Sequence, residues 1–354
     1  MKKSICIAGS GKIGRDAGMF FLTRGHAVHW VSGSEDRIVD LQAWVTKRVH
    51  LFLKRNAGGL REISACFGLY EELEDESFDV VFECTNESLK VKRDAFLRLA
   101  GRHSPEALLF SASSSILPSA IAQECCGLHV FYPLELAGVA ELIVPADLPP
   151  VKRDAAITFC KENGLAAIVQ SEATAFAVNR MLLPLQNEVF RALCRGVCSA
   201  DADAASASDL VGVGMCEFAR GVGPAVVAAA VENYRSRMSA AESELYGPLS
   251  SGLAAFDASL DGWKAAKPLA ASERDAMATS LYYLFINTCL RFLERGDLFG
   301  ADLNCALDRV LGATTTLEEA VSRAGKRTIA AALRAVRLSG GAEYFEPSAL
   351  LDAE

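Results

Sequence analysis

Apolar residues in the N-terminal half of the chain fall into short continuous runs, separated by glycine-rich, polar or amphipathic stretches. Runs that are apolar throughout are typical of strands buried on both faces of a parallel sheet. The pattern predicts a helix at 89–99 and strands within residues 4–8, 27–31, 77–87, 107–115 and 127–133. Strands that alternate with helices indicate the α/β class, here a doubly wound, Rossmann-type parallel sheet.

The C-terminal half has a different pattern, rich in alanine and helical in period, and it contains an internal repeat. "NEVFRALCRG" at 187–196 aligns with "NTCLRFLERG" at 287–296, sharing Asn, Arg, Leu, Arg and Gly at a spacing of 100 residues. We expect residues 245–272, which carry Gly, Pro and Ser, to connect the two copies. The predicted domains are a dinucleotide-binding domain at 1–172, a first all-α repeat at 173–265 and a second at 266–354.

Composition narrows the class of protein. The 354 residues are 51% hydrophobic and carry a formal net charge of −8, which argues against a nucleic-acid partner. No apolar run reaches membrane-spanning length, and the chain begins a strand after Lys2 and Lys3 without the apolar segment of a signal peptide. A cytoplasmic location is expected. The eleven cysteines form no CxxC pair and predict reduced core residues, with neither metal ligands nor disulfides.

The sharpest local motif follows the first strand, where "GSGKIG" places Gly9, Gly11 and Gly14 in the spacing GxGxxG before a helix. In this context the first glycine allows a tight turn, the second lets a pyrophosphate approach the backbone, and the third lets the helix pack on the strand. Residues 9, 11, 12, 13 and 14 are therefore the predicted cradle of a dinucleotide cofactor, with Lys12 and Ile13 between the glycines.

The end of the second strand bears on the choice between NAD and NADP. An NAD site usually has a carboxylate there, bound to the ribose 2′-hydroxyl, whereas this strand ends in Ser32. Ser32 and Ser34 could donate hydrogen bonds to a 2′-phosphate, and Arg37 could pair with it. The cofactor is expected to be NAD or NADP, with a slight preference for NADP.

Ligands of doubly wound sheets bind beyond the carboxyl ends of the strands. The predicted strands bring Glu87, Ser114 and His129 to that edge. Glu87, together with Lys92 in the following helix, is a further candidate contact of the cofactor.

The chain resembles the 3-hydroxyacyl-CoA dehydrogenase family in four motifs that occur in order: "FDVVFECTNESLKVKRDAF", "LLFSASSSIL", "GLHVFYPLELAGVAELI" and "AVNRMLLPLQNEVF". The resemblance implies that His129 is the general base, that Glu141 orients it, and that Ser114 and Asn179 lie beside the substrate oxygen. The chain departs from the family pattern at Ala112, Tyr132 and Thr174-Ala175, and the family's helical arm is shortened to about residues 36–59.

The implied activity is NAD(P)-dependent interconversion of a 3-hydroxyacyl and a 3-oxoacyl group, as a CoA or carrier-protein thioester. An imidazole suits the proton transfer, while hydroxyl and amide donors suit the alkoxide that develops. Two alternatives are a dehydrogenase of a small free hydroxy acid and a catalytically silent nucleotide-binding regulatory protein. The second helical copy has Ser280 and Leu281 where the first has Arg180 and Met181. Assembly is expected as a monomer with an internal pseudo-dimer or as a homodimer.

Overall fold

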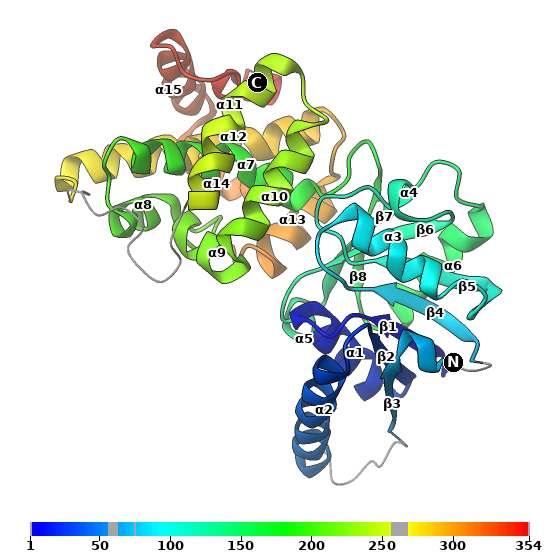
Figure 1. Ribbon diagram of the computed structural model, residues 1–354. Coiled ribbons are helices and arrows are strands. Elements are labelled where there is room, and N and C mark those ends of the chain that lie inside the picture. Colours follow the sequence, from blue (N-terminus) through cyan, green and yellow to red (C-terminus); the bar gives the residue numbers. More distant parts are fainter. Residues whose placement is uncertain (1, 56–62, 74–75, 256–267, 353–354) are drawn as a thin grey trace. The chain divides into compact units, whose positions relative to one another are not determined.

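A single sheet forms the first part of the chain, in the strand order β3-β2-β1-β4-β5-β6-β7-β8 (Figure 1). Its strands are β1 (Ser4–Ala8), β2 (Ala27–Ser32), β3 (Ser64–Leu69), β4 (Phe78–Glu83), β5 (His103–Ser111), β6 (Cys125–Val130), β7 (Val139–Val144) and β8 (Ala166–Ser171). The computed structural model describes residues 2–55, 63–73, 76–255 and 268–352. It divides into two units, 1–175 and 176–354. The predicted boundary after residue 172 lies close to this division; the one after 265 falls outside the described residues.

The helices of the first unit connect these strands. They are α1 (Lys12–Thr23), α2 (Glu35–Arg55), α3 (Leu89–Arg98), α4 (Pro118–Ile121), α5 (Leu134–Ala137) and α6 (Pro150–Glu162), with a 3-10 turn η1 at Tyr70–Glu72. The predicted fold class, the five predicted strands and the helix at 89–99 are confirmed. Strands β3, β7 and β8 were not predicted.

The sheet differs from an all-parallel one at a single pairing. Strand β7 runs antiparallel to β6, and β8 then pairs parallel with β7. Only residues 131–138 join β6 to β7, whereas a parallel return needs a crossover of about a dozen residues or more. This pair is the antiparallel exception in a sheet that is otherwise parallel, as predicted.

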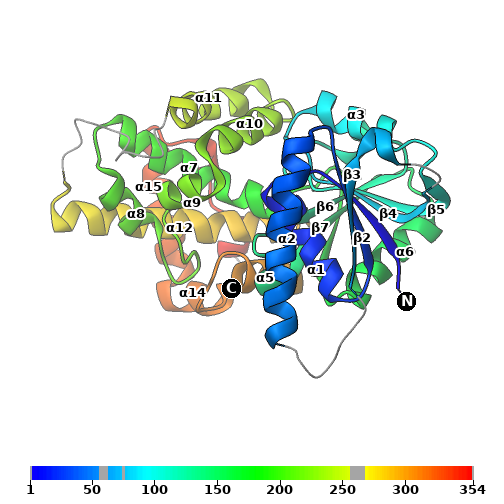
Figure 2. The same ribbon diagram turned by 60° about the horizontal axis from the view of Figure 1, so that its bottom comes forward.

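Alternating side chains build a core on each face of the sheet. On one face Ile5, Ile7 and other strand residues pack with α1, α2 and α6. On the other face Cys6 and Ala8 pack with α3. Figure 2 shows α3 above the fan of strands and α1 and α6 below it. Strands covered on both faces explain why their sequences are apolar throughout.

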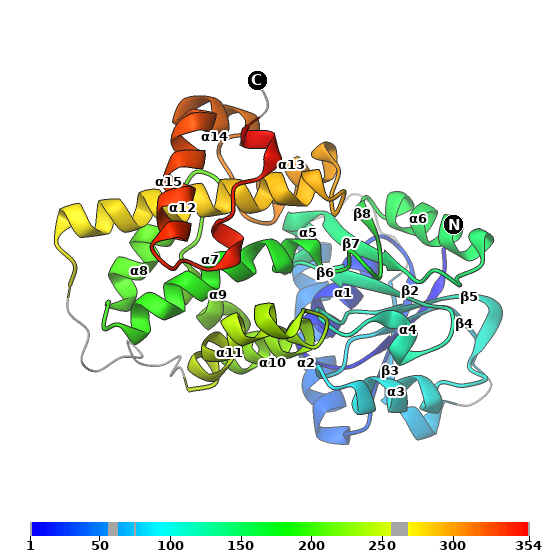
Figure 3. The same cartoon turned by 90° about the horizontal axis from the view of Figure 1, so that it is seen from above.

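The second unit is helical and shows the repeat in its element order. Its helices are α7 (Ala177–Cys194), α8 (Ser199–Ser206), α9 (Met215–Val222), α10 (Pro224–Arg235), α11 (Ala240–Ala255), α12 (Ala271–Glu294), α13 (Gly300–Arg309), α14 (Leu317–Ala324) and α15 (Lys326–Leu338), followed by the 3-10 turns η2 (Glu343–Phe345) and η3 (Ala349–Leu351). The order α7 to α10 recurs in α12 to α15, and α7 lies beside α12 (Figure 3).

Two contacts join the copies at equivalent positions. The amide of Gly212 donates to the carbonyl of Leu311 over 2.7 Å, and a Cβ on Gly212 would lie 3.0 Å from the carbonyl oxygen of Gly312. Asn187 and Asn287, both fully buried, hold the same tyrosine near the C-terminus. Nδ2 of Asn187 donates to the hydroxyl of Tyr344 over 2.9 Å, and Nδ2 of Asn287 donates to its main-chain carbonyl over 3.1 Å.

The predicted connection at 245–272 is corrected by the structure. Residues 245–255 belong to α11 and 271–272 to α12, while 256–267 lie outside the described residues. Tyr246, Leu249 and Leu253 are buried at helical spacing, so packing of one face sustains α11 despite Pro248 within it. In the part of the chain that the structure describes, no helix is long and apolar enough to span a membrane.

Candidate active site

In the turn between β1 and α1, the three glycines of GxGxxG lie where the predicted turn requires them. Gly9 has φ of 133°, and a Cβ there would lie 2.6 Å from the carbonyl oxygen of Cys84. A Cβ on Gly14 would lie 2.2 Å from the carbonyl oxygen of Gly9, so α1 can pack here only without a side chain. A Cβ on Gly11 would meet no described heavy atom within 4 Å. The turn is therefore closely packed at its two outer glycines and open at the middle one.

The N-terminus of α1 faces this open position with an unshielded helix dipole. Gly11 caps the helix without a side-chain hydrogen bond, and the first turn carries no acidic residue. Such an end favours an anion such as a pyrophosphate. Ile13 packs against the core of the sheet, whereas Nζ of Lys12 lies 4.1 Å from the ring centroid of Tyr132. The residues of the turn thus fit a dinucleotide phosphate group.

The carboxyl end of β2 combines two serines with nearby cations. Ser32 is buried, Ser34 is half-buried, and Arg37 is exposed in the first turn of α2. A cation that the sequence did not indicate comes from α3, because a Cβ on Gly33 would lie 3.7 Å from Nη1 of Arg98. The guanidinium of Arg98 also forms ion pairs of 2.9 Å with Glu71 and Asp94.

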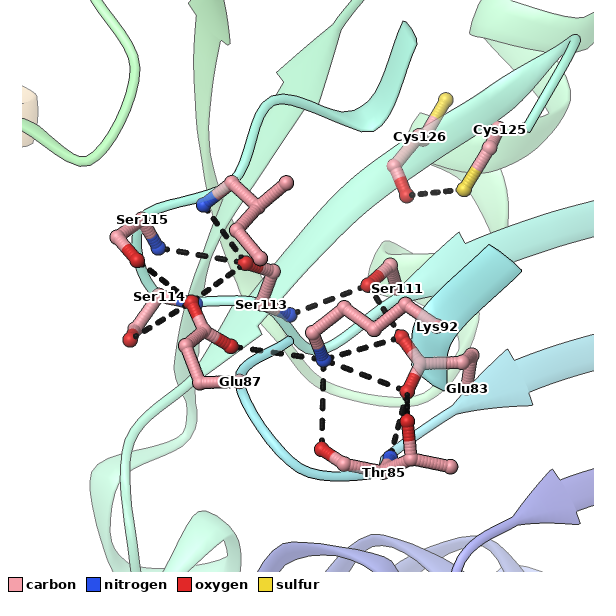
Figure 4. Close-up of polar contacts among 11 residues, drawn as sticks. Glu83, Thr85, Glu87, Lys92, Ser111, Ser113, Ser114, Ser115, Cys125 and Cys126 are labelled. Carbon is pink, nitrogen blue, oxygen red and sulfur yellow. Dashed lines mark hydrogen bonds and ion pairs between the residues drawn. The ribbon is translucent and has the colours of Figure 1, made fainter. Parts of the chain in front are cut away.

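Lys92 lies in a buried ion-pair network beyond β4 (Figure 4). Its Nζ is 3.1 Å from Oε2 of Glu83 and 3.5 Å from Oε2 of Glu87. Oε2 of Glu83 also accepts a hydrogen bond of 2.6 Å from the hydroxyl of Ser111 at the end of β5. Thr85 donates its amide and hydroxyl to the other oxygen of Glu83. The ammonium of Lys92 therefore forms ion pairs with two carboxylates, so its side chain is part of this network.

Glu87 holds the serine-rich loop that follows β5, as Figure 4 shows. Its Oε1 accepts hydrogen bonds from the hydroxyls of Ser113 and Ser115, each at 2.7 Å, and from the amide of Ser114 at 3.0 Å. Burial alone raises the pKa of Glu87, but the Lys92 ammonium and the serine hydrogen bonds outweigh it, so the pKa is lowered. An ionised Glu87 consequently fixes the position of Ser114.

His129 and Glu141 face each other across the antiparallel pair β6 and β7. They are direct register partners, and Nδ1 of His129 lies 2.7 Å from Oε2 of Glu141. Glu141 is fully buried, and His129 is 7% exposed. A carboxylate accepts a hydrogen bond from Nδ1–H, and in that tautomer Nε2 is the nitrogen that can receive a proton. The pair has the geometry of an oriented general base.

Asn179 belongs to the second unit, in the first turn of α7. Its Nδ2 donates to the hydroxyl of Tyr234 over 3.2 Å. The helix begins after Phe176, a buried residue with φ of 59° whose ring centroid lies 6.3 Å from that of Tyr234. This non-glycine residue in the left-handed region sets the start of α7 and with it the location of Asn179. Its predicted role beside His129 stays a prediction.

The structure thus brings two groups of predicted residues together within the first unit. His129 meets Glu141, and Glu87 meets both Ser114 and Lys92. The sequence did not indicate three residues of this region. They are Arg98 near the end of β2, Ser111, whose hydroxyl donates to Glu83, and Gln170, whose amide donates to Glu141 over 2.8 Å. A buried polar residue inside a strand was the available signal for Gln170.

The sheet and its glycine turn define a dinucleotide-binding domain of the Rossmann type, and comparison with known proteins gives the family of this domain. Residues 4–173 match the family model "3-hydroxyacyl-CoA dehydrogenase, NAD binding domain". The match assigns residues 4–173, just under half of the chain, to the NAD-binding domain of this family.

Similar proteins agree with this assignment. The chain is 29% identical over 215 residues to 3-hydroxybutyryl-CoA dehydrogenase of Bradyrhizobium diazoefficiens, covering 56% of this chain and 72% of that one. It is 27% identical over 210 residues to the lambda-crystallin homolog of Bos taurus, covering 55% of this chain and 65% of the relative. The structure of 3-hydroxybutyryl-CoA dehydrogenase from Escherichia coli superposes with a TM-score of 0.74 at 18% identity. It covers 99% of this chain and 98% of that one, and it shows a shared fold.

Proposed function

We propose that the protein is an NAD(P)-dependent dehydrogenase that interconverts a 3-hydroxyacyl and a 3-oxoacyl group carried as a CoA or carrier-protein thioester. The observation that carries the proposal is the buried His129–Glu141 pair at the carboxyl edge of a dinucleotide-binding sheet. The family assignment and the names of its relatives, 3-hydroxybutyryl-CoA dehydrogenases among them, support the choice of substrate class.

In the oxidation direction His129 receives the proton of the substrate's 3-hydroxyl at Nε2. Its Nδ1–H stays hydrogen-bonded to Glu141, whose negative charge stabilises the imidazolium that forms. The nicotinamide of the cofactor, when bound, supplies the hydride acceptor. General-base catalysis of this kind contributes a factor of about 10²–10⁴ in rate.

Ser114 and Asn179 are the proposed donors to the substrate oxygen. Glu87 fixes Ser114 by its main-chain amide at 3.0 Å, whereas the Ser114 hydroxyl is 3.4 Å from the same oxygen. The amide contact therefore fixes the main chain of Ser114, from which its hydroxyl is proposed to reach the substrate oxygen. Such donors stabilise the developing alkoxide, or polarise the ketone in the reverse direction.

For the cofactor we propose a slight preference for NADP over NAD. Ser32 and Ser34 offer hydroxyl donors at the end of β2, and no carboxylate stands at the strand end itself. Arg37 on α2 adds positive charge near this end, whereas the charge of Arg98 on α3 is compensated by its ion pairs with Glu71 and Asp94. A 2′-phosphate would gain from these groups, although Glu35 and Asp36 in the first turn of α2 limit the gain.

Steady-state reduction of acetoacetyl-CoA and of its carrier-protein thioester, each with NADPH and with NADH, tests the proposal. We expect turnover with at least one thioester and a higher kcat/KM with NADPH. Activity restricted to free 3-hydroxy acids would favour the small-acid dehydrogenase instead. Cofactor binding without turnover on any of these substrates would indicate the silent nucleotide-binding protein.

A further inference from the structure

Three neighbouring strands place His129, Glu141 and Gln170 in a row. Glu141 on β7 is the register partner of His129 on β6 and of Ile168 on β8. Gln170 is two residues beyond Ile168, so its side chain is on the same face of the sheet as the pair. Nε2 of Gln170 donates to Oε1 of Glu141 over 2.8 Å, while the other oxygen, Oε2, faces His129 at 2.7 Å.

The row is buried, and Gln170 is 3% exposed. A buried carboxylate must be held by donors, because its desolvation is otherwise costly. Each oxygen of Glu141 has a donor of a different kind, an imidazole N–H on one and an amide N–H on the other. The plane of the carboxylate is thereby fixed at both ends.

Because Gln170 is uncharged, it can hold Glu141 without reducing the negative charge of that carboxylate. A lysine or arginine at this position would compensate the negative charge of Glu141 and weaken its attraction for an imidazolium. A neutral amide orients the carboxylate and leaves its full charge available to His129 when a proton arrives. Nearby carboxylates have other partners, since Glu135 pairs with Arg24 at 2.7 Å and Asp16 accepts the amide of Leu134 at 2.7 Å.

We propose that Gln170 is a positioning residue, which acts through Glu141 to hold the His129 ring in the orientation and tautomer of a general base. The inference rests on the proposed function for its catalytic consequence. The contact between Gln170 and Glu141 stands on the geometry of β7 and β8 alone.

The main variant is Gln170→Met, which keeps the length of the side chain and removes its donor. We expect kcat to fall by about tenfold, in the range typical of lost supporting hydrogen bonds around a reactive group, with KM changed by less than about twofold. Without the donor, the His129–Glu141 pair holds a proton more tightly, so the acidic limb of the kcat/KM profile moves to higher pH. The matched control is Ile168→Val, a buried change on the same strand and face, which should leave the profile in place.

An NMR titration of imidazole resonances separates this inference from the proposed reaction. The chain has five histidines, and the His129 signal is identified by its absence in His129→Ala. In Gln170→Met its titration midpoint should move upward relative to wild type and to Ile168→Val. Such a shift without thioester turnover by the wild type supports the contact and overturns the proposed reaction. An unchanged midpoint together with unchanged kcat overturns the role of Gln170.

A second variant covers the case in which Gln170→Met does not fold. Gln170→Glu keeps size and polarity, and it places a second carboxylate beside Glu141. Two adjacent carboxylates share a proton, so the midpoint of the pair should move upward further than in Gln170→Met. A midpoint equal to that of wild type in this variant would also contradict the proposal.

Discussion

The ammonium of Lys92 lies 3.1 Å from Oε2 of Glu83, and the two side chains are 1% and 0% exposed. The same ammonium approaches Glu87, which in turn holds the serine loop. A buried charge is tolerated only with its partners in place, so this ion pair connects the stability of the domain to the geometry of its carboxyl edge.

Lys92→Met should destabilise the protein by about 3–5 kcal/mol, because it leaves the buried Glu83 and the half-buried Glu87 without their cation. The free energy of unfolding is measured by urea denaturation monitored by circular dichroism. Lys90→Met, an exposed change two residues earlier on the same helix, is the control and should cost less than about 0.5 kcal/mol. Equal effects of the two variants would contradict a structural role for the ion pair.

The lowered pKa of Glu87 predicts how stability depends on pH. Because the folded-state value lies below that of the unfolded chain, Glu87 stabilises the fold fully above the ordinary glutamate pKa of about 4.3. This contribution is lost as pH falls through the lowered value. Wild type should therefore lose more stability between pH 5.5 and 3.5 than Glu87→Gln, as measured by urea midpoints. Glu106→Gln, at an exposed position, should follow wild type.

His129→Ala should lower kcat by about 10² or more and leave cofactor affinity nearly unchanged. The substitution removes the proton acceptor, whereas the glycine turn and the N-terminus of α1 stay intact. Stopped-flow or steady-state kinetics gives kcat, and fluorescence titration of NAD(P)H gives the affinity. A kcat equal to that of wild type would remove His129 from the mechanism.

Ser32→Asp should shift cofactor preference toward NADH. A carboxylate at the end of β2 binds the ribose diol and repels a 2′-phosphate. The ratio of kcat/KM for NADPH to that for NADH measures the change. As a complement, Arg37→Ala should weaken NADPH more than NADH. A wild type that already prefers NADH strongly would show the proposed preference to be wrong.

Removing the second helical copy tests whether the two copies pack on each other as an internal pseudo-dimer. A chain ending near residue 265 lacks α12, which lies beside α7 in the second unit. The uncovered apolar side of α7 should then cause aggregation or a new dimer, measured by light scattering. A well-behaved, fully active monomer would rule out the pseudo-dimer.

The sequence predicted the central strands of the sheet because they are buried on both faces and apolar throughout. It missed β3 and β8, which lie at the two edges of the sheet and carry half-exposed positions. It also missed β7, where Glu141 interrupts an otherwise apolar run. The charged residue that interrupts the apolar pattern of β7 is also the hydrogen-bond partner of His129.

In the site, local features were predictable and distant ones were not. The spacing of Gly9, Gly11 and Gly14 specifies a turn by itself, because each glycine acts within a few residues. The contact of Gln170 with Glu141 depends on the register of β7 against β8, which no spacing along the chain records. The resemblance located His129 and Glu141 but not the third member of their row.

Tyr344 contacts the two helical copies in two different ways, which a symmetric pair of separate, identical chains could not do. It meets Asn187 through its hydroxyl and Asn287 through its main-chain carbonyl, so one residue is recognised in two unlike ways by equivalent asparagines. In a two-fold symmetric pair of identical subunits, any such contact would have to occur twice in the same form. A single chain that carries both copies is free of that constraint, so the copies can differ, as they do where the second has Ser280 and Leu281 in place of Arg180 and Met181.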